Sequence, residues 1–301
     1  MQTDVLIVGG GPAGLSAALV FGRARKRVLL CDAGTPRNAA AVGIHNFITR
    51  DGVSPRDFRA AAHADLGAYP SVETRAVGVV DVVRAGDRLS VTLEDGTTVS
   101  ARRVLLATGV VDVPPDVPGL AEAWGTSAFQ CPYCHGWEVR DRAWGVLAST
   151  DAVASWSLVL RGWTANLVLY TDGASLSADT SAKLDAAGVP VETTKIARLH
   201  SEAGHVHHVE LADGRTRPCD ALFLHPAQRP TALVVRMGLE LSEAGLVRVD
   251  DQKQSSMPGV HVAGDAAAHP QGAVMAASAG VFAAAMMNHA LTLDDVAGRL
   301  R

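Results

Sequence analysis

The residues whose types and spacing most plainly allow chemistry are two cysteines near the middle of the chain. They stand in the run Cys131-Pro132-Tyr133-Cys134-His135. Two cysteines separated by two residues can close a strained, easily reduced ring, and a nearby cation or helix end can hold one of them as thiolate. His135 adjoins the pair and can move protons near neutral pH. Cys131, Cys134 and His135 are therefore the candidate catalytic residues.

Other roles for these side chains are a zinc site, a pair of buried thiols and, for His135, a packing residue. A structural zinc site usually needs four ligands, and the sequence has no second cysteine pair with this spacing. The remaining candidate ligands could join the pair only through distant folding, namely Cys219, His205, His207 and His208. We therefore expect no metal site, whereas packing stays an open alternative for His135.

The composition is that of a folded chain and argues against several classes of protein. Of 301 residues, 48% are hydrophobic and 19% charged, and this length suggests two domains. The formal net charge of -4 leaves no broad basic surface, so we expect no nucleic-acid partner. Four cysteines are too few for a disulfide scaffold in so long a chain, and no basic leader precedes the first apolar run. These features predict a cytoplasmic protein.

A strand–helix–strand pattern occurs twice along the chain. The Pro-dense segment 113–119 and the chain around 222–230 are predicted crossings between domains. The sequence therefore predicts an α/β fold of two Rossmann-like, doubly wound domains, with the second (113–225) inserted into the first (1–112 and 226–301). The two patterns are predicted over Asp4–Val8, Ala13–Arg23 and Lys26–Cys31, and over Ala143–Ala148, Asp151–Arg161 and Asn166–Tyr170.

Further elements follow from the same periodicities. The stretch Gly272–Met287 is nearly all apolar, but it is short for a membrane span and rich in alanine and glycine. We expect it to be a buried helix, and we expect no membrane association. The other predicted elements are a helix over Pro55–Leu66 capped by Ser54, strands within 72–99, strands at Arg103–Ala107 and His261–Ala263, and a helix over Ala273–Leu291.

The first strand–helix–strand pattern contains a dinucleotide-binding fingerprint. Gly9 allows a tight turn, Gly11 lets the backbone approach a pyrophosphate, and Gly14 lets the helix pack on the strand. The helix N-terminus, with Pro12 and Ala13, faces the phosphates with its partial positive charge. Asp32 closes the second strand, where a carboxylate can accept hydrogen bonds from ribose hydroxyls. These residues alone do not distinguish FAD from NAD.

With these motifs in order, the sequence resembles the low-molecular-weight thioredoxin reductase family over nearly its whole length. The glycine loop with Asp32 looks like the FAD pyrophosphate loop and ribose carboxylate of that family. The cysteine pair lies where its redox disulfide lies. The resemblance implies bound FAD, a central domain that carries the cysteines, and a homodimer formed through the FAD domain. Further cofactor residues that it implies are Thr108 and Gly109, Gly264 and Asp265 of the run Pro258–Asp265, Asn46, and Ala273.

The second strand–helix–strand pattern departs from that family. A nucleotide-binding unit has glycines after its first strand, but this chain has Ala148-Ser149-Thr150, whose Cβ atoms would crowd a pyrophosphate. The family also carries a basic cluster for the NADPH 2′-phosphate after the second strand. Here 170–174 contains no base, and Asp172 would repel a phosphate. Both departures argue against NADPH.

The cysteine segment instead resembles the dithiol oxidases of natural-product pathways, which close the disulfides of gliotoxin, holomycin and romidepsin. The runs Cys131–Glu138, His45-Asn46-Phe47 and 49–52 carry this resemblance. It implies an FAD-dependent oxidase that passes electrons from a small-molecule dithiol, through the cysteines and FAD, to O2, giving H2O2. Tyr133 and Trp137 suggest an aromatic-lined substrate pocket, although they could also be core residues.

Two other functions compete with this one. The first is an NAD(P)H-dependent thioredoxin or disulfide reductase, and the missing NADPH features argue against it. The second is a non-catalytic flavin- or redox-sensing protein, and the intact Cys131/Cys134 pair argues against that.

Overall fold

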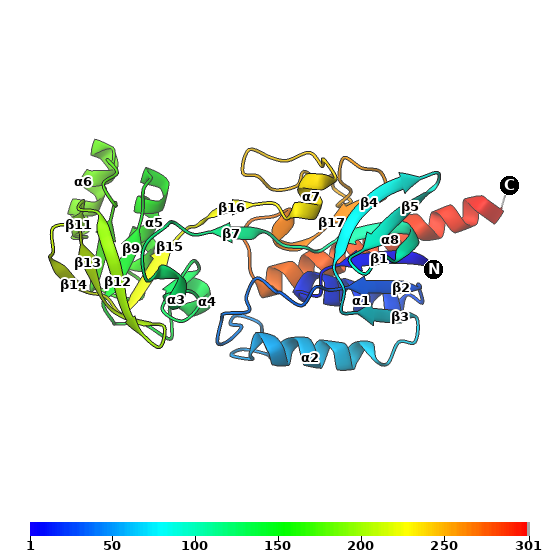
Figure 1. Ribbon diagram of the computed structural model, residues 1–301, viewed down its shortest axis with the longest axis horizontal. Helices are drawn as coiled ribbons and strands as arrows, with labels where there is room; N and C mark the ends of the chain where they lie inside the picture. Colours follow the sequence, from blue (N-terminus) through cyan, green and yellow to red (C-terminus); the bar gives the residue numbers. More distant parts are fainter. Residues whose placement is uncertain (300–301) are drawn as a thin grey trace. The chain divides into compact units, whose positions relative to one another are not determined.

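The computed structural model describes residues 1–299 and divides into two compact units, each containing a mainly parallel sheet with helices (Figure 1). The first unit comprises Met1–Ala39, Val53–Val111 and the chain from Gln228 onward, and the second comprises Ala40–Gly52 and Asp112–Ala227. The predicted α/β fold with two Rossmann-like units is confirmed. The predicted domain boundaries differ from this division in one segment, because 40–52 groups with the second unit.

The sheet of the first unit has seven strands in the order β3-β2-β1-β6-β5-β4, and β17 also pairs with β6. The end of β1 and all of β2 are buried, as expected for central parallel strands covered on both faces. The strands are β1 Gln2–Val8, β2 Val28–Cys31, β3 Val72–Arg75, β4 Val79–Ala85, β5 Arg88–Leu93, β6 Thr98–Leu106 and β17 Val260–Val262.

The register of this sheet brings four loops to one edge. Val8 pairs with Cys31 and with Leu106, and Leu106 pairs with Val262. These strands are parallel, so the loops that follow them all begin at the same edge. The loops start with Gly9, Asp32, Ala107 and Ala263, and they carry most of the predicted cofactor residues.

Four α-helices of the first unit complete its layers. The predicted helix over Pro55–Leu66 is confirmed, with the Ser54 hydroxyl accepting a hydrogen bond from the Asp57 amide. The last helix extends eight residues beyond the predicted end at Leu291. The helices are α1 Pro12–Arg23, α2 Pro55–Leu66, α7 Ala232–Arg236 and α8 Ala273–Arg299, with a short 3-10 turn η1 at Gly264–Ala266.

The second unit contains a five-stranded parallel sheet in the order β11-β10-β9-β15-β8 and an antiparallel sheet β12-β13-β14. The second predicted strand–helix–strand pattern is confirmed as β9, α5 and β10. Its strands are β8 Ala128–Phe129, β9 Trp144–Leu147, β10 Leu167–Tyr170, β11 Val191–Glu192, β12 Ile196–Glu202, β13 His205–Leu211, β14 Thr216–Pro218 and β15 Ala221–Leu224. Its helices are α3 Leu120–Ala123, α4 Pro132–His135, α5 Asp151–Leu160 and α6 Ala178–Ala186. Two further short strands, β7 Val111–Val113 and β16 Ala227–Arg229, pair with each other.

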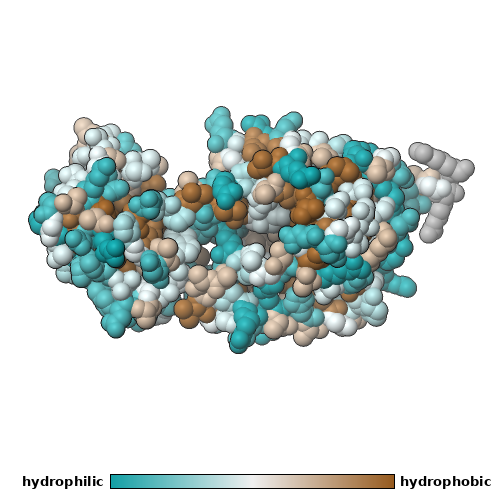
Figure 2. Space-filling model, viewed as in Figure 1, coloured by the Kyte–Doolittle hydropathy of each residue, from teal (hydrophilic) through white to brown (hydrophobic). Residues whose placement is uncertain are grey.

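Helix α8 is the one described helix long and apolar enough to cross a membrane, judged by length and composition over Ala273–Gly298. One face of it is buried in the core shared with α1, through Ala283, Ala284, Met287 and Leu291. That packing is typical of a core helix in a globular domain. On the face shown in Figure 2, hydrophobic residues are interspersed with hydrophilic ones over both units.

Close packing of α8 on α1 depends on Gly280. A Cβ atom at this position would lie 2.0 Å from the Ala13 carbonyl oxygen, which is backbone and cannot rotate away. We expect Gly280→Ala to lower the free energy of unfolding by about 1–3 kcal/mol. Gly298→Ala in the same helix meets nothing within 4 Å and should be neutral or stabilising by up to about 1 kcal/mol. Urea unfolding of both variants measures this, and equal stabilities would contradict the packing argument.

Candidate functional site

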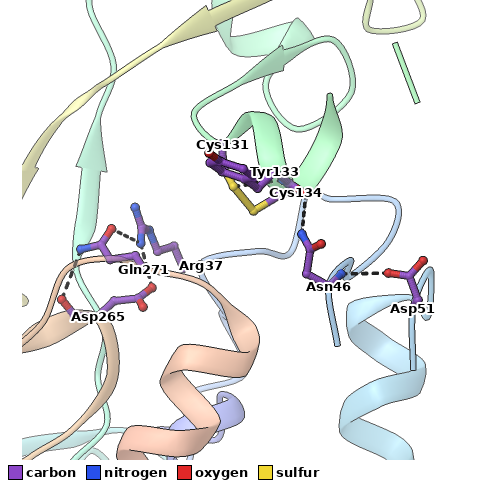
Figure 3. The surroundings of a disulfide bond; sticks show 8 residues. All are labelled: Arg37, Asn46, Asp51, Cys131, Tyr133, Cys134, Asp265 and Gln271. Carbon is purple, nitrogen blue, oxygen red and sulfur yellow. Dashed lines mark hydrogen bonds and ion pairs between the residues drawn. A yellow bond between two sulfur atoms is a disulfide. The ribbon is translucent and has the colours of Figure 1, made fainter. Parts of the chain in front are cut away.

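The two candidate cysteines form a disulfide in the second unit. Cys131 and Cys134 are joined with a Cα–Cα distance of 5.2 Å (Figure 3). Cys131 precedes the one-turn helix α4, and its sulfur accepts a hydrogen bond from the Cys134 amide at 3.1 Å. Both residues are partly exposed. The pair is therefore reachable from solvent, and a thiolate at Cys131 would keep an amide donor beside it.

His135 is held in an apolar contact next to the disulfide. Its ring stacks on Phe129 with centroids 4.5 Å apart and planes 12° apart. Neither ring nitrogen is exposed to solvent or has a hydrogen-bond partner within the described chain. Burial lowers the pKa of His135, with the nearby Cys131 backbone and the Glu138 carboxylate opposing it in part. The ring is therefore neutral at pH 7.

The segment 40–52 contacts the cysteine segment inside the second unit. Asn46 donates from its side-chain amide to the Tyr133 carbonyl, and its backbone amide donates to Asp51 at 2.8 Å (Figure 3). The ring of His45 lies between two carboxylates, 3.6 Å from Asp51 and 3.6 Å from Glu138. The structure thus places Asn46, a predicted cofactor residue, against the disulfide turn.

The two aromatic residues near the disulfide lie at the surface of their unit. Tyr133 and Trp137 are each 66% exposed, so the alternative that they are core residues is wrong. Tyr133 meets Trp163 edge-on at 5.3 Å, and the Arg140 guanidinium lies 3.9 Å above the Trp137 ring. They form an exposed aromatic surface on the element that carries the cysteines.

In the glycine loop of the first unit, two glycines are needed for packing and one leaves space for a ligand. Gly9 has φ +105°, and a Cβ atom there would lie 2.4 Å from the Ala107 carbonyl oxygen. A Cβ atom at Gly14 would lie 1.9 Å from the Gly9 oxygen. A Cβ atom at Gly11, by contrast, would have no other atom within 4 Å. Gly9 and Gly14 are required by the fold, whereas Gly11 leaves open backbone at the start of α1, as a pyrophosphate requires.

Two carboxylates of the same unit are each paired with an arginine that no sequence motif indicated. Asp32, at the end of β2, pairs with Arg59 of α2. Asp265, in η1, accepts from Arg37 at 2.7 Å (Figure 3). These pairs hold both predicted cofactor carboxylates in fixed orientations. Gly109 (φ +63°) also has open space around it, so the loops at this sheet edge offer acceptors and uncrowded backbone that fit FAD.

The turn after β9 in the second unit is filled by the chain itself. The Thr150 hydroxyl caps α5 by accepting from the Val153 amide, and Asp151 accepts from the Ser177 amide at 2.9 Å. That hydrogen bond lowers the pKa of Asp151. Asp172, after β10, accepts from the Ile196 amide at 2.9 Å. One basic residue lies near the turn after β10: the aliphatic part of the Lys195 side chain is beside Gly173.

Within residues 1–299, no group of three or more His, Cys, Asp or Glu side chains could hold a metal ion. Cys219 is fully buried, and burial raises the pKa of its thiol to about 12. It is therefore a core residue and no nucleophile at neutral pH.

Two Rossmann-like units, an uncrowded glycine loop with acceptor carboxylates, and a disulfide of the Cys-x-x-Cys type define a flavoprotein that exchanges thiols and disulfides. The chain belongs to the pyridine nucleotide-disulphide oxidoreductase family, whose profile matches residues 3–150 and 164–280. It binds FAD, as the thioredoxin reductase-like members do.

Individual relatives agree with this assignment. The chain is similar to thioredoxin reductase sirT of Leptosphaeria maculans, with 34% identity over 320 residues, 98% of this chain and 96% of that protein. A probable thioredoxin reductase of Arthroderma benhamiae is 37% identical over 182 residues, 58% of this chain and 45% of its own length. The crystal structure of HlmI superposes with a TM-score of 0.94 and 36% identity, covering 100% of this chain and 96% of that one.

The open position of Gly11 leads to a prediction about FAD. Gly11→Ala should leave the urea unfolding of the apoprotein unchanged, because its Cβ atom meets no neighbour. It should raise the FAD dissociation constant about tenfold or more by crowding the pyrophosphate. Fluorescence titration of apoprotein with FAD measures this, with Gly298→Ala as control. An FAD affinity equal to that of wild type would show that the pyrophosphate lies elsewhere.

Proposed function

We propose that this protein is an FAD-dependent dithiol oxidase. It forms an intramolecular disulfide in a small-molecule dithiol, and the electrons pass through Cys131 and Cys134 and FAD to O2, giving H2O2. The resemblance of the cysteine segment to the natural-product dithiol oxidases and the similarity to HlmI support this choice within the family. A cytoplasmic homodimer formed through the FAD domain belongs to the same proposal.

The filled turn of the second unit is the observation that carries the proposal. A dinucleotide-binding unit keeps the N-terminus of its first helix open for a pyrophosphate. Here the Thr150 side chain caps that terminus, and the ionised Asp151 is tied across it to Ser177. A phosphate would meet a fixed negative charge and no glycine backbone. Electrons must then enter from another donor, and the partly exposed disulfide is the group that a dithiol can reduce.

The chain's own residues account for the thiol chemistry. A substrate thiolate attacks the Cys131 sulfur and displaces Cys134 as thiolate. The second substrate thiolate then attacks the substrate sulfur bound to Cys131, which releases the cyclic disulfide and leaves Cys131 as thiolate. The Cys134 amide, which donates to the Cys131 sulfur at 3.1 Å, stabilises that leaving thiolate. FAD, when bound, accepts two electrons from the reduced pair and reduces O2.

Several residues are assigned supporting roles in this proposal. His135, neutral and next to the pair, accepts the substrate thiol proton. Tyr133 and Trp137 form the apolar surface on which the substrate rests while its sulfurs reach Cys131. Residues at the sheet edge of the first unit hold the cofactor: Gly9, Gly11, Pro12, Ala13, Gly14, Asp32, Thr108, Gly109, Gly264, Asp265 and Ala273.

The alternative is an NAD(P)H-dependent disulfide reductase. Lys195 favours it, because this base lies beside the turn after β10 although the turn itself contains none. The names of the relatives, which are thioredoxin reductases, favour it as well. A reductase would need the bond between Asp151 and Ser177 to open before a pyrophosphate could bind.

Substitution of the two cysteines tests the oxidase. Cys131→Ser and Cys134→Ser should abolish H2O2 formation with dithiothreitol under air while FAD stays bound, because no disulfide remains for the dithiol to reduce. Cys219→Ala should retain turnover, since that thiol is buried and protonated. Peroxide release and the flavin spectrum report both properties. Full turnover in Cys134→Ser would mean that electrons reach the flavin by another route.

The environment of His135 sets the expected pH dependence. Its pKa is lowered, so the neutral, proton-accepting form is lost only as the pH falls below the ordinary histidine value of about 6.5. Turnover of the wild type should therefore be level near pH 7 and decline on the acid side. His135→Ala should slow it about 100-fold and remove that decline. His205→Ala, at an exposed position of β13, is the control. If His135→Ala kept the decline on the acid side, His135 would be a packing residue.

A further inference from the structure

Arg37 lies where two distant segments of the first unit meet. Its Nη1 atom donates to Oδ2 of Asp265 at 2.7 Å and to Oε1 of Gln271 at 2.7 Å (Figure 3). Asp265 belongs to η1, and Gln271 lies just before α8. The side chains of Arg37 and Asp265 are only 16% and 19% exposed, so the pair is well shielded from water. One guanidinium thus joins the segment after β2 to η1 and to the segment just before α8.

The geometry fixes the orientation of the Gln271 amide. Arginine can only donate hydrogen bonds, so the Gln271 oxygen must face it. The Gln271 nitrogen then faces the opposite way, where it donates to the Gln228 side chain at 2.9 Å and to the Asp265 carbonyl at 3.3 Å. Gln228 returns a hydrogen bond to the Gln271 oxygen at 2.8 Å. Arg37 therefore sets the direction of the whole amide network at the start of α8.

The contact with Arg37 engages one oxygen of Asp265, because Oδ2 accepts from Nη1 of the arginine. A carboxylate held in this way can accept a further hydrogen bond from a cofactor hydroxyl at a fixed position. The charges of the two side chains also balance. Without Arg37, Asp265 would stand as an uncompensated negative charge in the cofactor site.

We propose that Arg37 is a cofactor-positioning residue, which orients Asp265 and Gln271 toward FAD and balances the charge of Asp265 beside it. The proposal rests on FAD binding and is independent of the electron donor and acceptor. Reduced flavin is more negative than oxidised flavin, so an unbalanced carboxylate nearby disfavours reduction. If Arg37 only stabilised the fold, its substitution would change stability and FAD affinity but would leave the flavin potential unchanged.

The test combines FAD affinity with the flavin midpoint potential of the reconstituted holoenzyme. Arg37→Gln should raise the FAD dissociation constant about tenfold or more and shift the potential to more negative values. Arg37→Lys keeps the positive charge but loses the planar fork, so it should weaken FAD binding while the potential stays near that of wild type. Arg236→Gln is the matched control, because Arg236 pairs with Asp81 at 3.3 Å at an exposed site of the same unit.

The three variants together distinguish a cofactor-positioning role of Arg37 from a purely structural one. A negative shift in Arg37→Gln, absent in Arg37→Lys and Arg236→Gln, supports the proposal. Unchanged affinity and potential in Arg37→Gln would overturn it, and so would weaker FAD binding with an unchanged potential. Dithiol-dependent peroxide formation is not used as a readout, so failure of the oxidase assignment and failure of this proposal remain distinguishable.

Discussion

The first unit depends on close backbone approaches that only glycine permits. A side chain at Gly9 would strike the residue that follows β6, one at Gly14 would strike the residue that follows β1, and one at Gly280 of α8 would strike the first turn of α1. These contacts pack α1 against both the sheet and α8, and the register aligns the loops after β1, β2, β6 and β17 at one sheet edge. The predicted cofactor site lies at this same edge, where a Cβ atom at Gly11 would meet no neighbour.

The two Rossmann-like units use one architecture in opposite ways. In the first, the N-terminus of α1 is uncrowded, and the carboxylates of Asp32 and Asp265 are paired with arginines. In the second, the N-terminus of α5 is capped by Thr150 and crossed by the ionised Asp151. The second unit instead presents a disulfide, a neutral histidine and exposed aromatic rings. Such a division of roles suits a protein that receives electrons as thiols rather than as hydride.

The features that could be predicted from the sequence are those determined by residues close together along the chain. The strand, glycine turn and helix at Gly9–Gly14 lie within one local unit, and so do the Cys131/Cys134 pair and the Ser54 cap of α2. Contacts between distant segments could not be predicted. Arg37 and Asp265 are 228 residues apart, and neither residue type indicates the other. The grouping of segment 40–52 with the cysteines, and the stacking of His135 on Phe129, likewise depend on tertiary packing that no periodicity encodes.

In the proposed reaction, electrons enter at the disulfide, and the second unit does not accept a nicotinamide nucleotide. Anaerobic stopped-flow mixing, followed at the oxidised flavin band, distinguishes the two electron donors. Dithiothreitol should bleach the flavin of the wild type but not of Cys131→Ser, whereas NADPH and NADH should leave the band unchanged over the same time. Rapid bleaching by micromolar NADPH would rule out the oxidase assignment and identify the protein as a nucleotide-dependent reductase.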